Sequence, residues 1–115
     1  MLPQGLPRIC RLHTQTDFQR VFKGGIKLHK SGLIGWIYKN PSHTSVRFAV
    51  VVSRKLGPAV VRNRTKRLLR EAFRHSRIDL PVGTDIIVCP QQSEKLKNVH
   101  AAQEALKSLC GNSAC

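Results

Sequence analysis

Residues 58–77 contain many basic side chains and also keep the spacing of packing residues that a helix needs on one face. This segment is the richest in side chains that could do chemistry. At 100° per residue, a helix here gathers its packing side chains on one face: Val61, Thr65, Leu68, Leu69, Ala72 and Phe73. The polar side chains gather roughly opposite: Arg62, Asn63, Lys66, Arg67, Arg70, Arg74 and Arg77. The pattern predicts a helix that packs through one face and binds a polyanion through the other.

A charged helix face can also be no more than a solvated surface. A solvated face usually alternates the sign of its charges, but Glu71 is the only acid between Arg54 and Arg77. Like charges four residues apart repel by about 0.2–0.5 kcal/mol per pair, so an anionic partner would relieve the strain. Arginine outnumbers lysine here, which suits bidentate phosphate contacts and stacking on bases. The segment therefore favours nucleic-acid binding.

A second basic group, Ser53-Arg54-Lys55-Leu56-Gly57, precedes this helix. Such a loop meets phosphates through its side chains and through the free N–H groups of the helix start, or it is an ordinary polar turn. The segment lacks the G-x-x-x-x-G-K-[ST] pattern, so nucleotide hydrolysis is not indicated.

Aromatic residues offer a third group. Phe18 and Phe22 are four residues apart on an expected helix, a spacing that fits either core packing or a ligand platform. Trp36 and Tyr38 share one face of an expected strand. If exposed, such rings stack on unpaired bases, with cations beside them: Arg20, Lys23, Lys39 and Arg47.

The remaining chemistry-bearing residues are scattered. The five histidines and six acids form neither a nucleophile–base pattern nor metal-ligand spacing, so we predict no catalytic residue and no metal site. The cysteines make no C-x2-C motif and are expected to be free thiols: Cys10, Cys89, Cys110 and Cys115. The sequence predicts a binding protein.

Composition agrees with this interpretation. A formal net charge of +14 over 115 residues suits a nucleic-acid partner. The length suits a single domain over 1–115. Its core is expected at about 8–110, with a loose N-terminal lead-in and C-terminal tail. No apolar run approaches the roughly 20 residues that cross a bilayer, and the N-terminus lacks a signal-peptide core. We expect a cytoplasmic protein with no membrane and no small-molecule substrate.

The elements that position these groups follow from capping, turn and periodicity signals. Helices are expected at 17–23, capped by a Thr16–Gln19 capping box, at 58–77, and from a Ser93 cap to 110, ending at Gly111. Strands are expected at 26–29, 33–39, 45–53 and 85–89, with the second and third forming an antiparallel pair. The order is αβββαβα, an α+β two-layer sandwich.

Three segments together resemble one family. The signature R-N-R-x-K-R-x-x-R-E-x-F of the protein component of bacterial ribonuclease P is similar to residues 62–73. That family's N-terminal pattern resembles Arg11-Leu12 followed by Asp17-Phe18-x-x-Val21-Phe22-Lys23-x-Gly25, and its S-[KR]-K-x-G resembles residues 53–57. The similarity spans about residues 8–110, and the chain departs from it with Trp36 where tyrosine is frequent.

The resemblance implies a four-stranded sheet with helices packed on it and a left-handed βαβ crossover. It also implies an endoribonuclease in which a magnesium-assisted RNA subunit removes the 5′ leader of precursor tRNA, with no cofactor bound by the protein. Positions facing ribonuclease P RNA would be Arg54, Lys55, Arg62, Asn63, Arg64, Lys66, Arg67 and Arg70. The cleft for the single-stranded leader would be lined by Phe18, Phe22, Trp36 and Arg47.

Two other functions fit the composition: a structural RNA-binding protein such as a ribosomal component, and a basic DNA-binding module. The second is weaker, because no helix-turn-helix partner is spaced before the basic helix. The RNA partner's architectural type, further substrates and the oligomeric state are not encoded in any pattern that we recognise.

Overall fold

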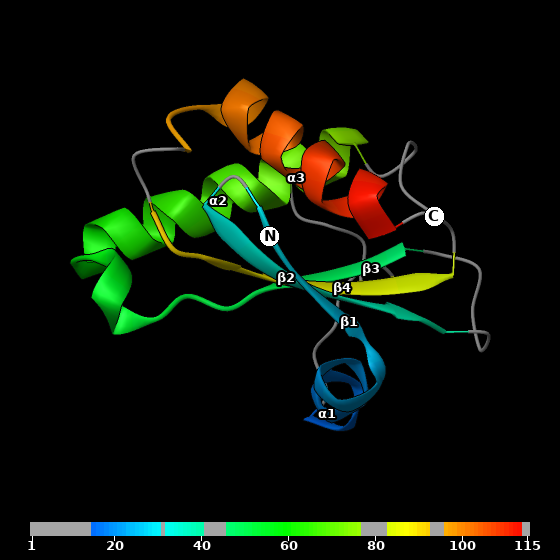
Figure 1. Cartoon of the computed structure of the whole chain (residues 1–115). Helices are drawn as coiled ribbons and strands as arrows, with labels where there is room; N and C mark the ends of the chain where they lie inside the picture. The colour runs from blue at the N-terminus through cyan, green and yellow to red at the C-terminus, as the bar shows by residue number, and fades with distance from the viewer. Residues whose placement is uncertain (1–14, 31, 41–45, 77–82, 93–95, 114–115) are drawn as a thin grey trace.

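The computed structural model describes residues 15–30, 32–40, 46–76, 83–92 and 96–113. Its elements follow the expected αβββαβα order, with one added 3₁₀ turn (Figure 1). In chain order they are α1 (Gln15–Gly24), β1 (Ile26–Lys30), β2 (Leu33–Lys39), β3 (Val46–Val50), η2 (Arg54–Leu56), α2 (Ala59–Ser76), β4 (Thr84–Pro90) and α3 (Val99–Ser113).

The four strands form one mixed sheet in the order β1-β2-β4-β3. β2 pairs antiparallel with both β1 and β4, while β3 pairs parallel with β4. The expected antiparallel pair of the second and third strands is therefore wrong, because β4 lies between them. Ile86, Ile87 and Val88 of β4 are all almost completely buried, and a strand that is apolar on both faces is most stable in a central position.

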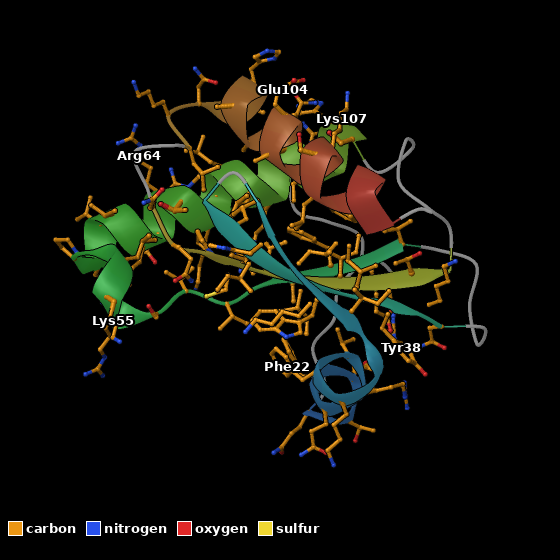
Figure 2. The ribbon with its side chains drawn as sticks, in the orientation of Figure 1. Phe22, Tyr38, Lys55, Arg64, Glu104 and Lys107 are labelled. Atoms are coloured by element: carbon orange, nitrogen blue, oxygen red, sulfur yellow. The ribbon has the colours of Figure 1, made fainter. Side chains whose placement is uncertain are left out.

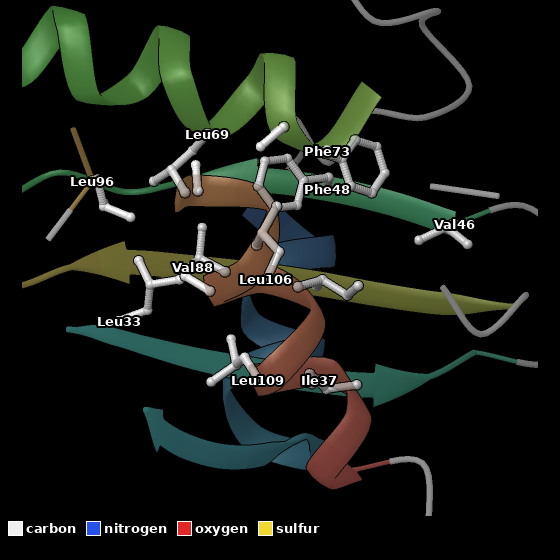
Figure 3. Close-up of a cluster of buried hydrophobic side chains, with 14 residues drawn as sticks. Leu33, Ile37, Val46, Phe48, Leu69, Phe73, Val88, Leu96, Leu106 and Leu109 are labelled. Atoms are coloured by element: carbon white, nitrogen blue, oxygen red, sulfur yellow. The ribbon is translucent and has the colours of Figure 1, made fainter. Parts of the chain in front are cut away.

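The connection from β3 through α2 to β4 is a left-handed crossover, as the family resemblance implied (Figure 3). Right-handed crossovers are the rule for parallel strands. The consequence here is that α2 lies on the same face of the sheet as α3, with its basic side free.

Most of the core lies between the sheet and these two helices (Figure 3). The rings of Phe48 in β3 and Phe73 in α2 stack with centroids 4.3 Å apart, and Leu69, Leu106 and Leu109 are fully buried beside them. Gly35 leaves room for Leu109. A Cβ at position 35 would collide with the Leu109 side chain.

The opposite face of the sheet carries α1, so helices cover both sides (Figure 1). Val21 of α1 is buried against Ile87 of β4 in a small cluster flanked by Phe18, Trp36, Tyr38 and Ala49. Few apolar contacts therefore hold α1 to the sheet, so its polar contacts contribute a larger share of its attachment.

Several predicted boundaries are wrong for local reasons. α1 already includes Thr16 and Gln19, so these residues do not form a capping box. α3 begins at Val99, because Asn98 caps it: its Oδ1 accepts a hydrogen bond from the Ala101 N–H at 2.8 Å. Ser93 lies outside the described residues, and the helix continues past Gly111 to Ser113.

α2 begins one residue after Pro58, and the predicted last residue, Arg77, lies outside the described part. β3 ends at Val50 and is shorter than predicted, although the Val51 N–H still donates to the Val88 carbonyl at 2.9 Å. Among the described residues, no helix has the length and apolar character needed to cross a membrane.

Candidate nucleic-acid interface

The orientation of α2 decides which of its cations face solvent. Its buried side chains are those of Thr65, Leu69, Ala72, Phe73 and Ser76. The Thr65 hydroxyl is satisfied within the helix, donating to the Val61 carbonyl oxygen at 2.8 Å. The opposite side exposes four of the predicted residues: Asn63, Arg64, Arg67 and Arg70. This face is polar and carries no carboxylate of its own.

Lys66 and Arg62 are both half-buried and depart from the predicted face, and Arg62 shows the reason. On the helix it lies about 20° around the axis from Leu69, which is on the packed side. Its side chain is half-buried, and its Nε is buried with no hydrogen-bond partner among the described residues. The helical-wheel assignment of Arg62 to the exposed face is therefore wrong, although the guanidinium keeps its charge.

Arg74 is half-buried and already paired. Its Nη2 donates to Glu71 Oε2 at 2.6 Å, and His75 Nε2 lies 3.1 Å from the same oxygen. The hydrogen bond from Arg74, followed by its charge and by His75, lowers the pKa of Glu71. The only acid of the helix thus neutralises Arg74 at one end of α2, leaving the preceding cations without a carboxylate partner on their own helix.

The predicted loop before the helix is the 3₁₀ turn η2, and both Arg54 and Lys55 are exposed on it. Gly57 closes this turn with φ of +150°, a conformation that other residues rarely adopt, and a Cβ there would press on Val61. The turn places Arg54 and Lys55 next to the start of α2. Figure 2 shows Lys55 and Arg64 on opposite sides of that helix, so the cationic surface wraps around its first turns.

The aromatic residues gather on the other face of the sheet. Phe22 meets the Trp36 ring edge-on with centroids 4.9 Å apart, and the Phe18 and Phe22 rings are 6.3 Å apart. Phe18 and Trp36 are half-buried in the α1 cluster, whereas Phe22 is 43% exposed. The core-packing prediction holds for Phe18 and Trp36, whereas the exposed ring of Phe22 leaves the ligand platform a prediction (Figure 2).

Arg47 is engaged inside the protein. Its Nε and Nη2 both lie 2.9 Å from the two carboxylate oxygens of Asp85, which is fully buried, and its Nη2 lies 3.3 Å from Asp17. Asn40 also donates to Asp85. The hydrogen bond to Asp85 is the main reason why the pKa of Arg47 is raised. This group joins β3, β4 and α1.

The sequence analysis did not find this ion-pair group or its buried acid. Asp85 begins an otherwise apolar segment, and a lone carboxylate there signals a buried partner, since a buried charge is costly unless it is paired. The partner itself was not identifiable, because Arg47 meets Asp85 only through the β3–β4 register.

No group of three or more metal-ligating side chains occurs within the described ranges. Cys89 is a free thiol, as predicted, and burial raises its pKa. The side chains of Cys10, Cys110 and Cys115 lie outside those that are described.

Comparison with known proteins identifies the family. The family model for Ribonuclease P matches residues 6–113. The chain belongs to the ribonuclease P protein family. It is similar to the ribonuclease P protein component of Thermotoga petrophila, with 39% identity over 112 residues covering 94% of this chain and 95% of that protein. The component of Staphylococcus epidermidis is 35% identical over 104 residues, covering 90% of each chain.

Solved structures agree with the family assignment. The ribonuclease P protein of Thermotoga maritima superimposes with a TM-score of 0.76 at 35% identity, covering 89% of this chain and 96% of that one. A Staphylococcus aureus ribonuclease P protein does so with a TM-score of 0.77 at 30% identity, covering 90% and 94%. The predicted fold is confirmed, and the chain is a protein subunit of the bacterial type of ribonuclease P, an endoribonuclease.

Proposed function

We propose that this ribonuclease P subunit binds the catalytic RNA through η2 and the exposed side of α2. The observation that carries the proposal is the set of exposed, basic side chains on two consecutive elements: Arg54 and Lys55, then Arg64, Arg67 and Arg70. Arginine forks match phosphate geometry, and Asn63 adds a directional hydrogen bond. Lys66 and Arg62, both half-buried, would reach the RNA only along the flank of the helix.

The second part of the proposal is that the aromatic face binds the single-stranded 5′ leader of precursor tRNA. Phe22 offers an exposed ring, and Trp36 and Phe18 hold it in place from the sheet and from α1. Stacking on such a ring accepts any base, which suits a leader of variable sequence. Arg47 would serve this site by fixing α1.

The reaction itself is assigned to the RNA subunit with magnesium, and the protein promotes it by binding. No catalytic side chain, cofactor or metal of the protein enters the proposal, and the partners are ribonuclease P RNA and precursor tRNA. Its place of action would be the cytoplasm.

The deciding experiment is cleavage of a precursor tRNA by a bacterial ribonuclease P RNA at low magnesium, with and without this protein. We expect strong stimulation that depends on the presence of a leader. Tight binding to the same RNA without stimulation would instead support a structural RNA-binding protein.

A further inference from the structure

The edge strand β1 contributes a cation to the aromatic face that no sequence pattern indicated. Lys27 is paired in register with Trp36 of β2, so both side chains lie on the face of the sheet that carries α1. The Lys27 ammonium is 5.8 Å from the centre of the Trp36 ring, within the range of a cation–π contact. Lys27 therefore places an exposed charge against the same Trp36 ring that the exposed ring of Phe22 contacts.

Other cations near this face are less suited to meet a bound strand. The guanidinium of Arg47 is held by Asp85 and Asp17, and Arg20 pairs with the same Asp17 oxygen at 3.2 Å. Lys23 is exposed on α1 but has no described contact with the Trp36 ring, whereas Lys27 does. Of these side chains, Lys27 has both a free charge and a fixed position relative to the rings.

A single strand that stacks a base on Phe22 brings its phosphates within a few ångströms of that ring. Stacking is apolar and leaves the phosphate charge uncompensated, so a neighbouring ammonium completes the site.

We propose that Lys27 contacts a phosphate of the single-stranded leader beside the nucleotide that stacks on Phe22, and so contributes to selection of leader-bearing substrate. This inference rests on the proposed leader function. It names a leader-binding residue outside the three motifs that carry the family resemblance, on the β1 edge of the sheet.

The test compares Lys27→Met, which keeps much of the apolar stem and removes the charge, with Lys27→Arg, which keeps the charge. Each is assembled with a bacterial ribonuclease P RNA, and its affinity is measured for precursor tRNA with a short leader and for mature tRNA, at several salt concentrations. Lys107→Met is the matched control, because Lys107 is exposed on α3, across the sheet from the rings (Figure 2).

We expect Lys27→Met to weaken binding of the leader-bearing substrate about two- to fivefold, the usual scale of an exposed ionic contact. Its log–log salt dependence should fall by about 0.7, the value for one phosphate of a single strand. Mature tRNA binding should not change, Lys27→Arg should behave as wild type, and Lys107→Met should have no leader-specific effect.

An unchanged salt dependence for Lys27→Met, or an equal loss for both substrates, would overturn the proposal. Failure of the proposed function is separately visible, because the wild-type complex would then bind both substrates equally. Trp36 is the only tryptophan, so its emission provides a second readout: leader binding should alter it in the wild type and mature tRNA should not.

Discussion

Phe22 is a residue of α1 and Arg47 is bonded to α1 through Asp17, yet the two side chains have opposite relations to solvent. Phe22 is a large apolar side chain that remains 43% exposed, whereas the charge of Arg47 is turned inward to a buried carboxylate. Burial of the phenyl ring and exposure of the guanidinium would be the ordinary arrangement. At the residue scale, the reversal indicates a surface for binding and an internal anchor for α1.

Phe22→Ala should weaken binding of leader-bearing precursor tRNA about tenfold, since loss of one stacking contact costs roughly 1–3 kcal/mol. Binding of mature tRNA should stay unchanged. Equilibrium binding to the assembled complex measures both. As a control, Val60→Ala removes an exposed apolar side chain from α2 and should leave the ratio of the two affinities unchanged. If Phe22→Ala weakened binding of both substrates equally, the leader assignment would be wrong.

Arg47→Met should lower the free energy of unfolding by about 3 kcal/mol, because it leaves the carboxylate of Asp85 buried without its main partner. Urea denaturation followed by Trp36 emission gives the value. Arg20→Met removes the more exposed pairing of Asp17 and should cost less than about 1 kcal/mol. Similar losses in the free energy of unfolding for the two substitutions would show that the internal ion pair of Arg47 stabilises the fold no more than the exposed pair of Arg20.

At the scale of elements, α2 combines a packing role and a binding role on opposite sides. Leu69 and Phe73 hold it to the sheet and α3, while Arg67 and Arg70 face solvent. Since the two sides share only the helix backbone, the binding side should tolerate substitution without loss of the fold. η2 extends the same surface by a separate element.

Arg67→Glu combined with Arg70→Glu should weaken binding to ribonuclease P RNA by more than tenfold, because two attractive phosphate contacts become repulsive. The circular dichroism spectrum should remain native, since both side chains are exposed. Lys107→Glu on α3 has the same kind of charge change and should have little effect. Loss of the native spectrum in the double variant would mean that these arginines support the fold.

At the scale of the whole molecule, charge and topology act together. The chain carries a formal +14, and the left-handed crossover places α2 on the same face of the sheet as α3, packed through its apolar side. The aromatic face lies on the other side of the sheet, beside α1. One small fold therefore presents two surfaces of different chemistry, one basic and one aromatic.

Affinity for ribonuclease P RNA should fall steeply with salt. If six cations each neutralise one phosphate, the log–log slope should be about −4 to −5; they are Arg54, Lys55, Arg64, Lys66, Arg67 and Arg70. Replacing Arg54 and Lys55 with alanine should reduce the slope by about 1.5. A slope near zero, or one that these substitutions leave unchanged, would contradict the proposed surface.

The sequence by itself determined the element order, the basic side of α2 and the family, because local periodicity and short motifs carry that information. Only the tertiary structure decided that β4 separates β2 from β3, that Arg47 is tied to Asp85, and that Lys27 lies over Trp36. Each of these depends on strand register between distant segments. Capping, turn and hydrophobic patterns act within a few residues, and long-range pairing is chosen by the burial of the assembled sheet.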